Sequence, residues 1–162
     1  MTPSESCFYQ PESLRAEQSV GYLMRRAGSS ISQQIDRQLT EHDLTHAQWL
    51  PLYKLLKGHC QTLAEMARDL QLDAGALSRA LDKLEAKGLV HRVRSTVDRR
   101  VVQVALTDAG RRQAQVVPPV LSNVLNAHLK GFSEAEWHTL IDLLSRMVAN
   151  GEAMKDTAQE AA

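Results

Sequence analysis

The sequence has only two cysteines, Cys7 and Cys60, and they lie far apart along the chain. They form no Cys-x-x-Cys pair, so neither a zinc knuckle nor a disulfide framework is indicated. No stretch approaches the roughly 18 apolar residues of a membrane helix, and the N-terminus lacks a basic start followed by an apolar segment. These absences predict a cytoplasmic protein with free thiols and no membrane partner.

The signatures of catalysis are also missing. We find no glycine-rich phosphate loop, no nucleophile elbow and no pair of carboxylates at a useful spacing. The sequence therefore predicts no enzymatic activity and no cofactor. What remains is an ordinary globular composition, with 43% hydrophobic and 23% charged residues in 162 positions. That length suffices for one domain with a real hydrophobic core.

The charge of the chain is zero in total but unevenly distributed. Between Gly75 and Arg112 there are nine basic and four acidic residues, a net charge of +5, so the rest of the chain carries −5. A basic segment on an otherwise acidic molecule is typical of a protein with one face for a polyanion. A solvated charged face is the alternative on charge alone.

Apolar residues recur at three- and four-residue spacing along most of the chain, which predicts a mainly α-helical fold. The first helix begins after Pro11, runs for about 25 residues through Leu39, and is long enough to need a second surface such as a dimer partner. Thr45 caps a second helix that Gly58 closes. A capping box of Thr62 and Glu65 starts the third.

The fourth helix is capped by Asp73, carries Leu77, Leu81 and Leu84 on one face, and ends at Gly88. Together with the third it has helix-turn-helix geometry. The pattern then changes to β-branched segments around a basic turn, which predicts a hairpin wing over residues 89–106. Thr107 caps a fifth helix that Pro118 and Pro119 bend, and Ser133 with Glu136 starts a last helix running to Gly151.

Two stretches carry a family resemblance. One stretch contains Asp98-Arg99-Arg100, followed by Leu106-Thr107 and Gly110. It is preceded by Leu84-Glu85-x-Lys87-Gly88-Leu89-Val90-x-Arg92. This combination resembles the signature of the multiple antibiotic resistance regulator (MarR) family. Leu44-Thr45-x-x-Gln48-Trp49 is similar to the start of the same family's second helix. The resemblance implies a winged helix-turn-helix in a helical dimerisation frame, acting as a homodimer that represses transcription from near-palindromic double-stranded operator DNA until an effector releases it.

The fourth helix is expected to enter the major groove with its N-terminal end. Small residues there allow close approach, Ser78 and Arg79 can donate to base edges, and basic residues can contact phosphate. In the wing, Asp98 orients an arginine that enters the minor groove or grips phosphate. The expected DNA-binding residues are Ala74, Gly75, Ala76, Ser78, Arg79, Lys83, Arg94, Asp98, Arg99 and Arg100.

The resemblance also implies an effector site between the dimerisation frame and the DNA-binding lobe, where many members of the family bind aromatic acids. His46, Trp49 and Tyr53 recur on one face of the second helix, although Trp49 and Tyr53, each taken alone, fit better as core residues. The planar guanidinium of an arginine on the first helix can donate two hydrogen bonds to a carboxylate. The expected ligand-binding residues for a small aromatic carboxylate are Arg25, Ser29, His46, Trp49 and Tyr53.

The predicted organisation has five parts: a flexible arm over 1–11, a dimerisation helix and connection over 12–44, a winged helix-turn-helix lobe over 45–107, C-terminal dimerisation helices over 108–151 and a disordered tail over 152–162. Two alternatives stay open. One is a thiol or metal sensor of the same architecture, through Cys7, Cys60 or the pair His42 and His46. The other is a winged-helix module for protein contacts without DNA binding.

Overall fold

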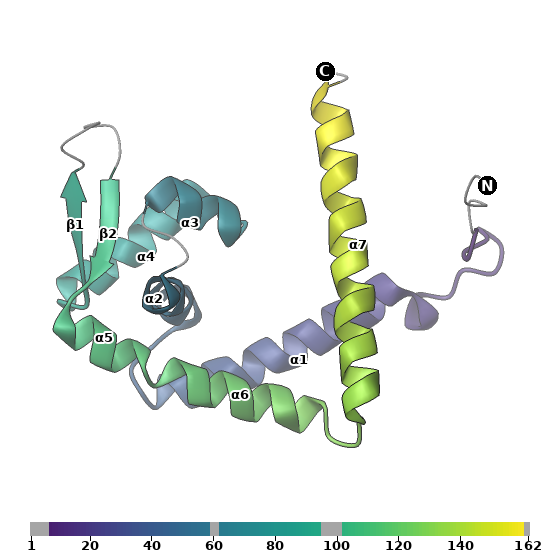
Figure 1. Cartoon of the computed structure of the whole chain (residues 1–162), viewed down its shortest axis with the longest axis horizontal. Helices are drawn as coiled ribbons and strands as arrows, with labels where there is room; N and C mark the ends of the chain where they lie inside the picture. The colour runs from purple at the N-terminus through teal and green to yellow at the C-terminus, as the bar shows by residue number, and fades with distance from the viewer. Residues whose placement is uncertain (1–6, 59–61, 95–101, 161–162) are drawn as a thin grey trace. The chain divides into compact units, whose positions relative to one another are not determined.

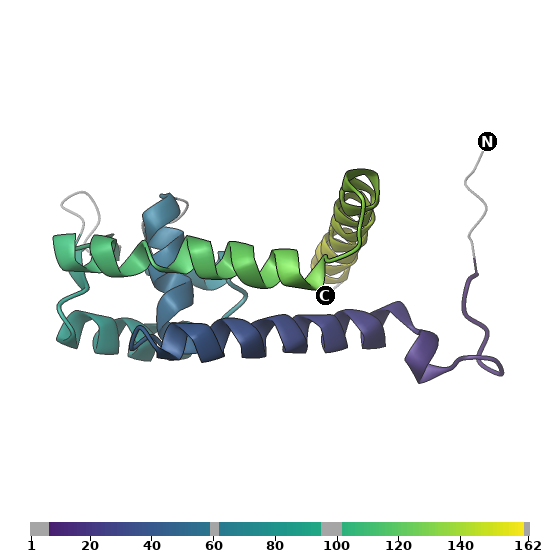
Figure 2. The same cartoon turned by 90° about the horizontal axis from the view of Figure 1, so that it is seen from below.

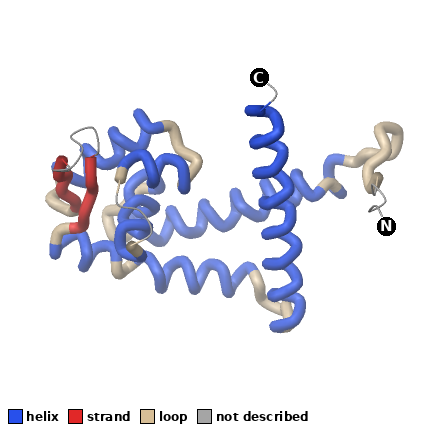
Figure 3. Tube along the Cα trace, turned by 45° about the horizontal axis from the view of Figure 1, so that its top comes forward, coloured by secondary structure: helices blue, strands red, loops and turns tan. Residues whose placement is uncertain are grey.

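The computed structural model describes residues 7–58, 62–94 and 102–160, with side chains described up to Val93 and Met154 at two of these ends. It is mainly helical with one two-stranded hairpin, which confirms the predicted fold class (Figure 1; Figure 3). The chain divides into two compact units, Met1–Val124 and Leu125–Ala162. In the described part of the chain, no helix is both long and apolar enough to cross a membrane.

The first unit begins with a short 3-10 helix, η1 (Ala16–Gln18), and the helix α1 (Val20–Thr40). The first helix thus begins later than expected, because Ser19 caps it by accepting a hydrogen bond from the Tyr22 backbone N–H at 3.2 Å. The Tyr9 hydroxyl accepts a second bond, from the Val20 N–H at 3.0 Å. Part of the expected arm therefore contacts the start of α1.

The predicted winged helix-turn-helix lobe has the expected order of elements. It contains α2 (His46–Lys57), α3 (Leu63–Asp69), α4 (Ala74–Ala86), β1 (Val90–Arg94) and β2 (Val102–Leu106). The strands pair antiparallel, with Val90 opposite Leu106 and Arg92 opposite Val104. The Thr62–Glu65 capping box forms, and Gly58 ends α2 in a left-handed conformation at a φ of 71°.

One hydrophobic core joins these elements. Leu77, Leu81 and Leu84 are fully buried on one face of α4, as their spacing predicted. They pack in a cluster with buried side chains from α1, the α1–α2 connection, α2, α3, the hairpin, α5 and α6: Ile35, Leu39, Leu44, Trp49, Leu52, Met66, Val90, Val104, Ala114, Val117, Val120 and Val124.

The predicted bent helix after the wing is two helices, α5 (Asp108–Ala114) and α6 (Val117–His128). The break falls at residues 115–116, just before the prolines. Pro118 and Pro119 then occupy the first turn of α6, where a missing backbone N–H costs no helical hydrogen bond. The two views show α5 and α6 continuing in nearly the same direction (Figure 1; Figure 2).

The second unit contains α7 (Glu134–Glu160). Its start is the predicted capping box: the Ser133 N–H donates to the Glu136 carboxylate at 2.8 Å, and the Ser133 hydroxyl accepts from the Glu136 N–H. The expectation of a helix end at Gly151 and a disordered tail is wrong for residues 152–160, which continue α7. Residues 152–160 include several strong helix formers and no glycine or proline after Gly151, so nothing stops the helix.

Candidate nucleic-acid interface and effector junction

The N-terminal half of α4 presents a small, exposed surface. The Asp73 carboxylate caps the helix by accepting the Ala76 N–H at 2.9 Å. Ala74, Gly75, Arg79 and Lys83 are exposed, and we call these four residues the α4 surface. The opposite face is buried in the core. The sequence-predicted residues Ala76 and Ser78 are half-buried at its edge.

Arg79 turns back toward the start of its own helix. A Cβ placed on Gly75 would stand 3.5 Å from an Arg79 guanidinium nitrogen and 3.0 Å from the Asp73 carboxylate. The guanidinium therefore lies beside the Gly75 backbone, where the positive end of the helix dipole also lies. Positive charge and small side chains are thus combined at the end of α4 that the sequence assigned to DNA.

The wing is tied to α4 through Arg92 of β1. Its guanidinium donates to the Asp82 carboxylate at 2.6 Å and to the Ser78 carbonyl at 2.9 Å, and the Glu85 carboxylate lies 3.8 Å away. The Glu85 carboxylate also accepts the Arg92 backbone N–H at 3.1 Å. Asp98, Arg99 and Arg100 of the predicted site, and the side chain of Arg94, lie outside the described residues.

Two basic residues counted in the +5 segment are paired with acidic side chains of this chain. Arg92 pairs with Asp82, and the Lys87 ammonium contacts both the Asp43 carboxylate and the Asp43 carbonyl at 2.9 Å. Lys87 therefore connects the C-terminal end of α4 to the turn between α1 and α2. Gln113 of α5 also donates to the His42 carbonyl of this turn.

A second polar cluster joins α1 to α2. One oxygen of Asp36 accepts a hydrogen bond from the Trp49 indole N–H at 3.1 Å and lies 3.0 Å from the His46 ring nitrogen Nδ1. The His46 and Trp49 rings meet edge to face, with centroids 5.7 Å apart. Trp49 is only 6% exposed, so it is a core residue, and its indole N–H has Asp36 as a hydrogen-bond acceptor. Nothing in the sequence singled out Asp36.

The other residues predicted for the effector site are not assembled with this cluster. The Arg25 guanidinium lies 5.6 Å from the centre of the Tyr22 ring on the exposed side of α1. Arg25 and Ser29 precede Asp36 by eleven and seven residues, which on a helix correspond to about 16 and 10 Å. Tyr53 is half-buried, with the Lys57 ammonium 5.7 Å from its ring centre. Within one chain, only His46, Trp49 and Tyr53 share the predicted face.

Among the residues that the structure describes, the candidate sensor residues assemble no metal site. In the ranges that the structure describes, no group of three or more His, Cys, Asp or Glu side chains could hold a metal ion. Cys7 is exposed, and its sulfur contacts the Tyr9 carbonyl and the Gln10 amide. Cys60 lies outside the described residues.

Comparisons with known proteins agree with this geometry. The family model described as "MarR family" matches residues 44–102. The multiple antibiotic resistance protein MarR of Escherichia coli is 33% identical over 123 residues, which cover 73% of this chain and 85% of that protein. The regulator SarZ of Staphylococcus haemolyticus is 26% identical over 131 residues, 80% of this chain and 86% of its own. These relatives are transcriptional regulators, which confirms the prediction that the chain is not an enzyme.

Solved structures show the same fold. A mutant of Escherichia coli MarR complexed with operator DNA has a TM-score of 0.71 and 29% identity, over 78% of this chain and 91% of that one. The structure of Bordetella bronchiseptica BpsR, described as explaining regulation of its DNA binding by 6-hydroxynicotinic acid, has a TM-score of 0.70 and 25% identity, over 80% of this chain and 98% of that one.

Proposed function

Because the chain belongs to the MarR family and is a DNA-binding transcriptional regulator, we propose that it is a homodimeric repressor that a small aromatic acid releases from near-palindromic operator DNA. The observation that carries the DNA-binding part is the α4 surface, with its small residues and Arg79 exposed and its other face buried. The wing behind it is held in place by Arg92.

The test of the DNA contact is the Arg79→Ala variant on a duplex taken from upstream of the protein's own gene. If Arg79 makes a paired contact to a guanine, its loss lowers the binding free energy by about 1–3 kcal/mol and relaxes the preference at one base pair. Arg146→Ala on α7 is the matched control and leaves affinity unchanged. Equal affinity of Arg79→Ala and the unaltered protein at moderate salt would contradict the contact.

Exposed apolar faces support the homodimer. On α7, Trp137, Ile141, Met147 and Val148 are each at least 41% exposed although they lie on one stripe of the helix. On α1, Val20, Leu23 and Met24 are similarly exposed. Faces of this kind favour contact with a second copy, and two recognition helices would then read half-sites about 34–36 Å apart.

Light scattering tests the dimer. Glutamate placed in the stripe, Ile141→Glu with Val148→Glu, should convert the dimer to a monomer at micromolar concentration. The control carries the same charge on the opposite face of α7, as Thr139→Glu with Asn150→Glu, and should remain dimeric. A monomeric mass for the unaltered protein would contradict the proposal.

The effector part rests on the junction of α1 and α2 and on the named ligand of the similar BpsR structure. His46 and Tyr53 offer a ring and a hydroxyl to an aromatic ligand. Arg25 is too far along α1 to reach this junction from the same chain, so it contributes only where a second copy brings it there. Release follows if the ligand binds more tightly to the DNA-free arrangement.

Calorimetric titration with 6-hydroxynicotinic acid tests this site. His46→Ala and Arg25→Ala should each weaken binding, whereas Arg26→Ala, whose guanidinium also lies near the Tyr22 ring at 5.9 Å, is the matched control. Binding that is unaffected by both substitutions would place the ligand elsewhere. A thiol or metal sensor has no supporting geometry among the described residues, and the DNA complex of a relative disfavours a protein-contact module.

A further inference from the structure

Asp73 places a negative charge at the end of α4 that carries the α4 surface. The residue is exposed, and its Oδ1 accepts a hydrogen bond from the Ala76 N–H at 2.9 Å. Among the described residues, no cation lies within ion-pair distance of this carboxylate, whereas Asp43 and Asp82 each have a cationic partner. An unpaired carboxylate on a surface that meets a polyanion lowers the affinity of that surface for phosphate.

The capping role of Asp73 does not require its charge. A helix is capped about as well by Ser or Asn as by Asp, since a side-chain oxygen is enough to accept the N–H. The charge matters because of its position. The N-terminal end of a helix attracts phosphate through its free N–H groups and its dipole. Asp73 fills this position with an anion of the protein itself, so a DNA phosphate is excluded from the end of α4.

Gly75 lies between the side chains of Asp73 and Arg79. A Cβ placed on Gly75 would stand 3.0 Å from Oδ1 of Asp73 and 3.5 Å from Nη1 of Arg79. Arg79, like Asp73, has no ion-pair partner in the part of the chain that the structure describes. The end of α4 therefore presents a hydrogen-bond acceptor and a hydrogen-bond donor on either side of one glycine, and both can turn to DNA.

We propose that Asp73 is a specificity-determining residue, which excludes phosphate from the end of α4 and accepts a hydrogen bond from the N4 amino group of a cytosine. This inference rests on the proposed function, in which α4 enters the major groove. An arginine recognises the O6 and N7 acceptors of guanine, whereas a carboxylate recognises the cytosine amino group, which is a donor. Because Asp73 and Arg79 flank a single residue, the bases that they contact belong to neighbouring base pairs. Asp73 thus weakens binding to DNA in general and favours sites with this cytosine.

Binding to a set of duplexes tests the role of Asp73. The set contains the duplex from upstream of the protein's own gene, its single base-pair substitutions, and a scrambled duplex of equal length. Asp73→Asn keeps an oxygen for the cap and removes the charge, so it should fold and bind the scrambled duplex about three- to tenfold more tightly. Its preference for cytosine should fall at least about fivefold, at the base pair next to the one where Arg79→Ala loses its preference.

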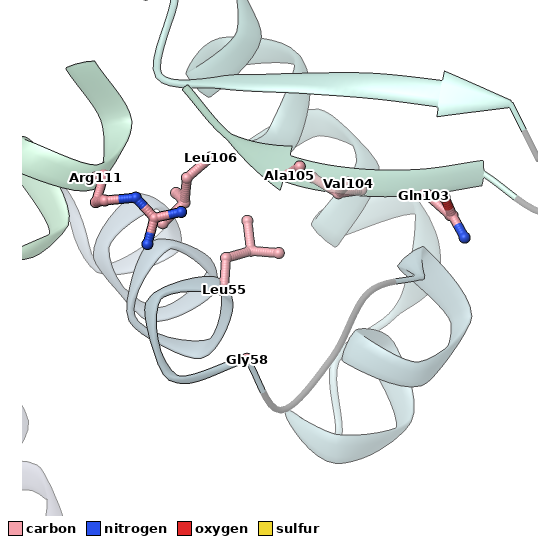
Figure 4. Close-up of a pocket in the computed structure, with 7 residues that line it drawn as sticks. All are labelled: Leu55, Gly58, Gln103, Val104, Ala105, Leu106 and Arg111. Atoms are coloured by element: carbon pink, nitrogen blue, oxygen red, sulfur yellow. The ribbon is translucent and has the colours of Figure 1, made fainter. Parts of the chain in front are cut away.

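Asp108→Asn is the matched control, because it removes the same charge far from the α4 surface. Asp108 is exposed at the start of α5, directly after Thr107, whose hydroxyl donates to the Gly88 carbonyl at 2.7 Å. It therefore lies near the end of α4 that is opposite Asp73. The same part of α5 borders a cavity of about 230 Å³, with Arg111 on its wall (Figure 4). Asp108→Asn should bind every duplex like the unaltered protein.

A second variant shows whether the charge is responsible. Asp73→Ser also caps the helix without a charge, so it should bind the scrambled duplex as tightly as Asp73→Asn does. The proposal is wrong if both variants bind this duplex no more tightly than the unaltered protein, or if both keep the preference for cytosine. Equal operator affinity of Arg79→Ala and the unaltered protein would contradict the proposed DNA contact as well. Lower affinity of Arg79→Ala, with both Asp73 variants unchanged, would contradict only the role of Asp73.

Discussion

Arg92 of β1 and Asp82 of α4 are joined by an ion pair of 2.6 Å, and the same guanidinium reaches the Ser78 carbonyl one turn earlier on α4. Arg92 therefore joins the wing to α4 both through an ion pair and through a hydrogen bond to the backbone. Arg92 is a positioning residue, since its side chain is turned toward the protein and only 22% exposed.

Replacing Arg92 by alanine should detach the wing from α4. Loss of the paired contacts lowers the free energy of unfolding by about 1–2 kcal/mol, because Asp82 is exposed enough for water to replace part of them. Operator affinity should fall while its salt dependence stays the same, since Arg92 neutralises no phosphate. Urea unfolding measures the change in stability, and operator binding at several salt concentrations measures the affinity and its salt dependence. A change in the salt slope equal to one lost phosphate contact would show that Arg92 touches DNA.

Replacing Gly110 and replacing Gly151 by alanine should have opposite effects on the stability of the protein. A Cβ on Gly110 would overlap the Leu89 carbonyl, so Gly110→Ala forces α5 away from the base of β1 and costs about 3 kcal/mol or more. At Gly151 inside α7 a Cβ would meet nothing within 4 Å, so Gly151→Ala should stabilise the protein by about 0.5–1 kcal/mol. Thermal unfolding of the two variants measures this contrast, and a neutral Gly110→Ala would refute the close approach.

The Asp36→Ala variant should destabilise the α1–α2 junction. It leaves the buried Trp49 indole N–H without its acceptor, at a cost of about 1–3 kcal/mol. Asp142→Ala is the control, because the exposed pair of Asp142 with Arg146 at 3.9 Å contributes little. Urea unfolding followed by tryptophan fluorescence compares the two variants. Equal stability of both would mean that water satisfies the indole in place of Asp36.

The start of α7 should be sensitive to acid. Hydrogen bonds from the Ser133 backbone N–H and then its hydroxyl hold the pKa of Glu136 below its usual value. A carboxyl group with a lowered pKa in the folded state stabilises that state above the unfolded pKa of about 4.3, and this contribution is lost as pH falls through the folded pKa. NMR titration should show that the pKa of Glu136 is raised in Ser133→Ala and unchanged in the control Ser145→Ala.

Local signals in the sequence predicted most of the fold. The capping boxes of Thr62 with Glu65 and of Ser133 with Glu136 form as expected, because each is decided by residues three positions apart. The break before Pro118 and the length of α7 were predicted less accurately, since a helix end depends on the helix propensity of the residues beyond it as well as on the stop residue itself. The first error divides one predicted helix into α5 and α6, the second shifts the end of α7, and neither changes the path of the chain through the other elements.

The site was predicted less completely, for a physical reason. The exposure of Ala74, Gly75 and Arg79 on α4 could be predicted, because exposure on one helix follows from periodicity. The roles of Asp36, Arg92 and Lys87 depend on which elements meet in space, and charge alone does not distinguish a surface cation from one that bridges two helices. Arg111 was counted only as part of a basic segment, although it lines a cavity.

The ion pair between Lys87 and Asp43 bears on how α4 can move. It joins the end of α4 opposite Ala74 to the turn in which α1 ends, so a rotation of α4 about Lys87 would displace the Ala74 end most. Thirteen residues of helix make a lever arm of about 20 Å. A tilt of about 10° around Lys87 then moves the Ala74 end of α4 by roughly 3.4 Å, the rise of one base-pair step. Because Leu77, Leu81 and Leu84 of α4 are fully buried, a tilt of this size has to carry their core contacts with it, so α4 and the elements packed against it would move as one body.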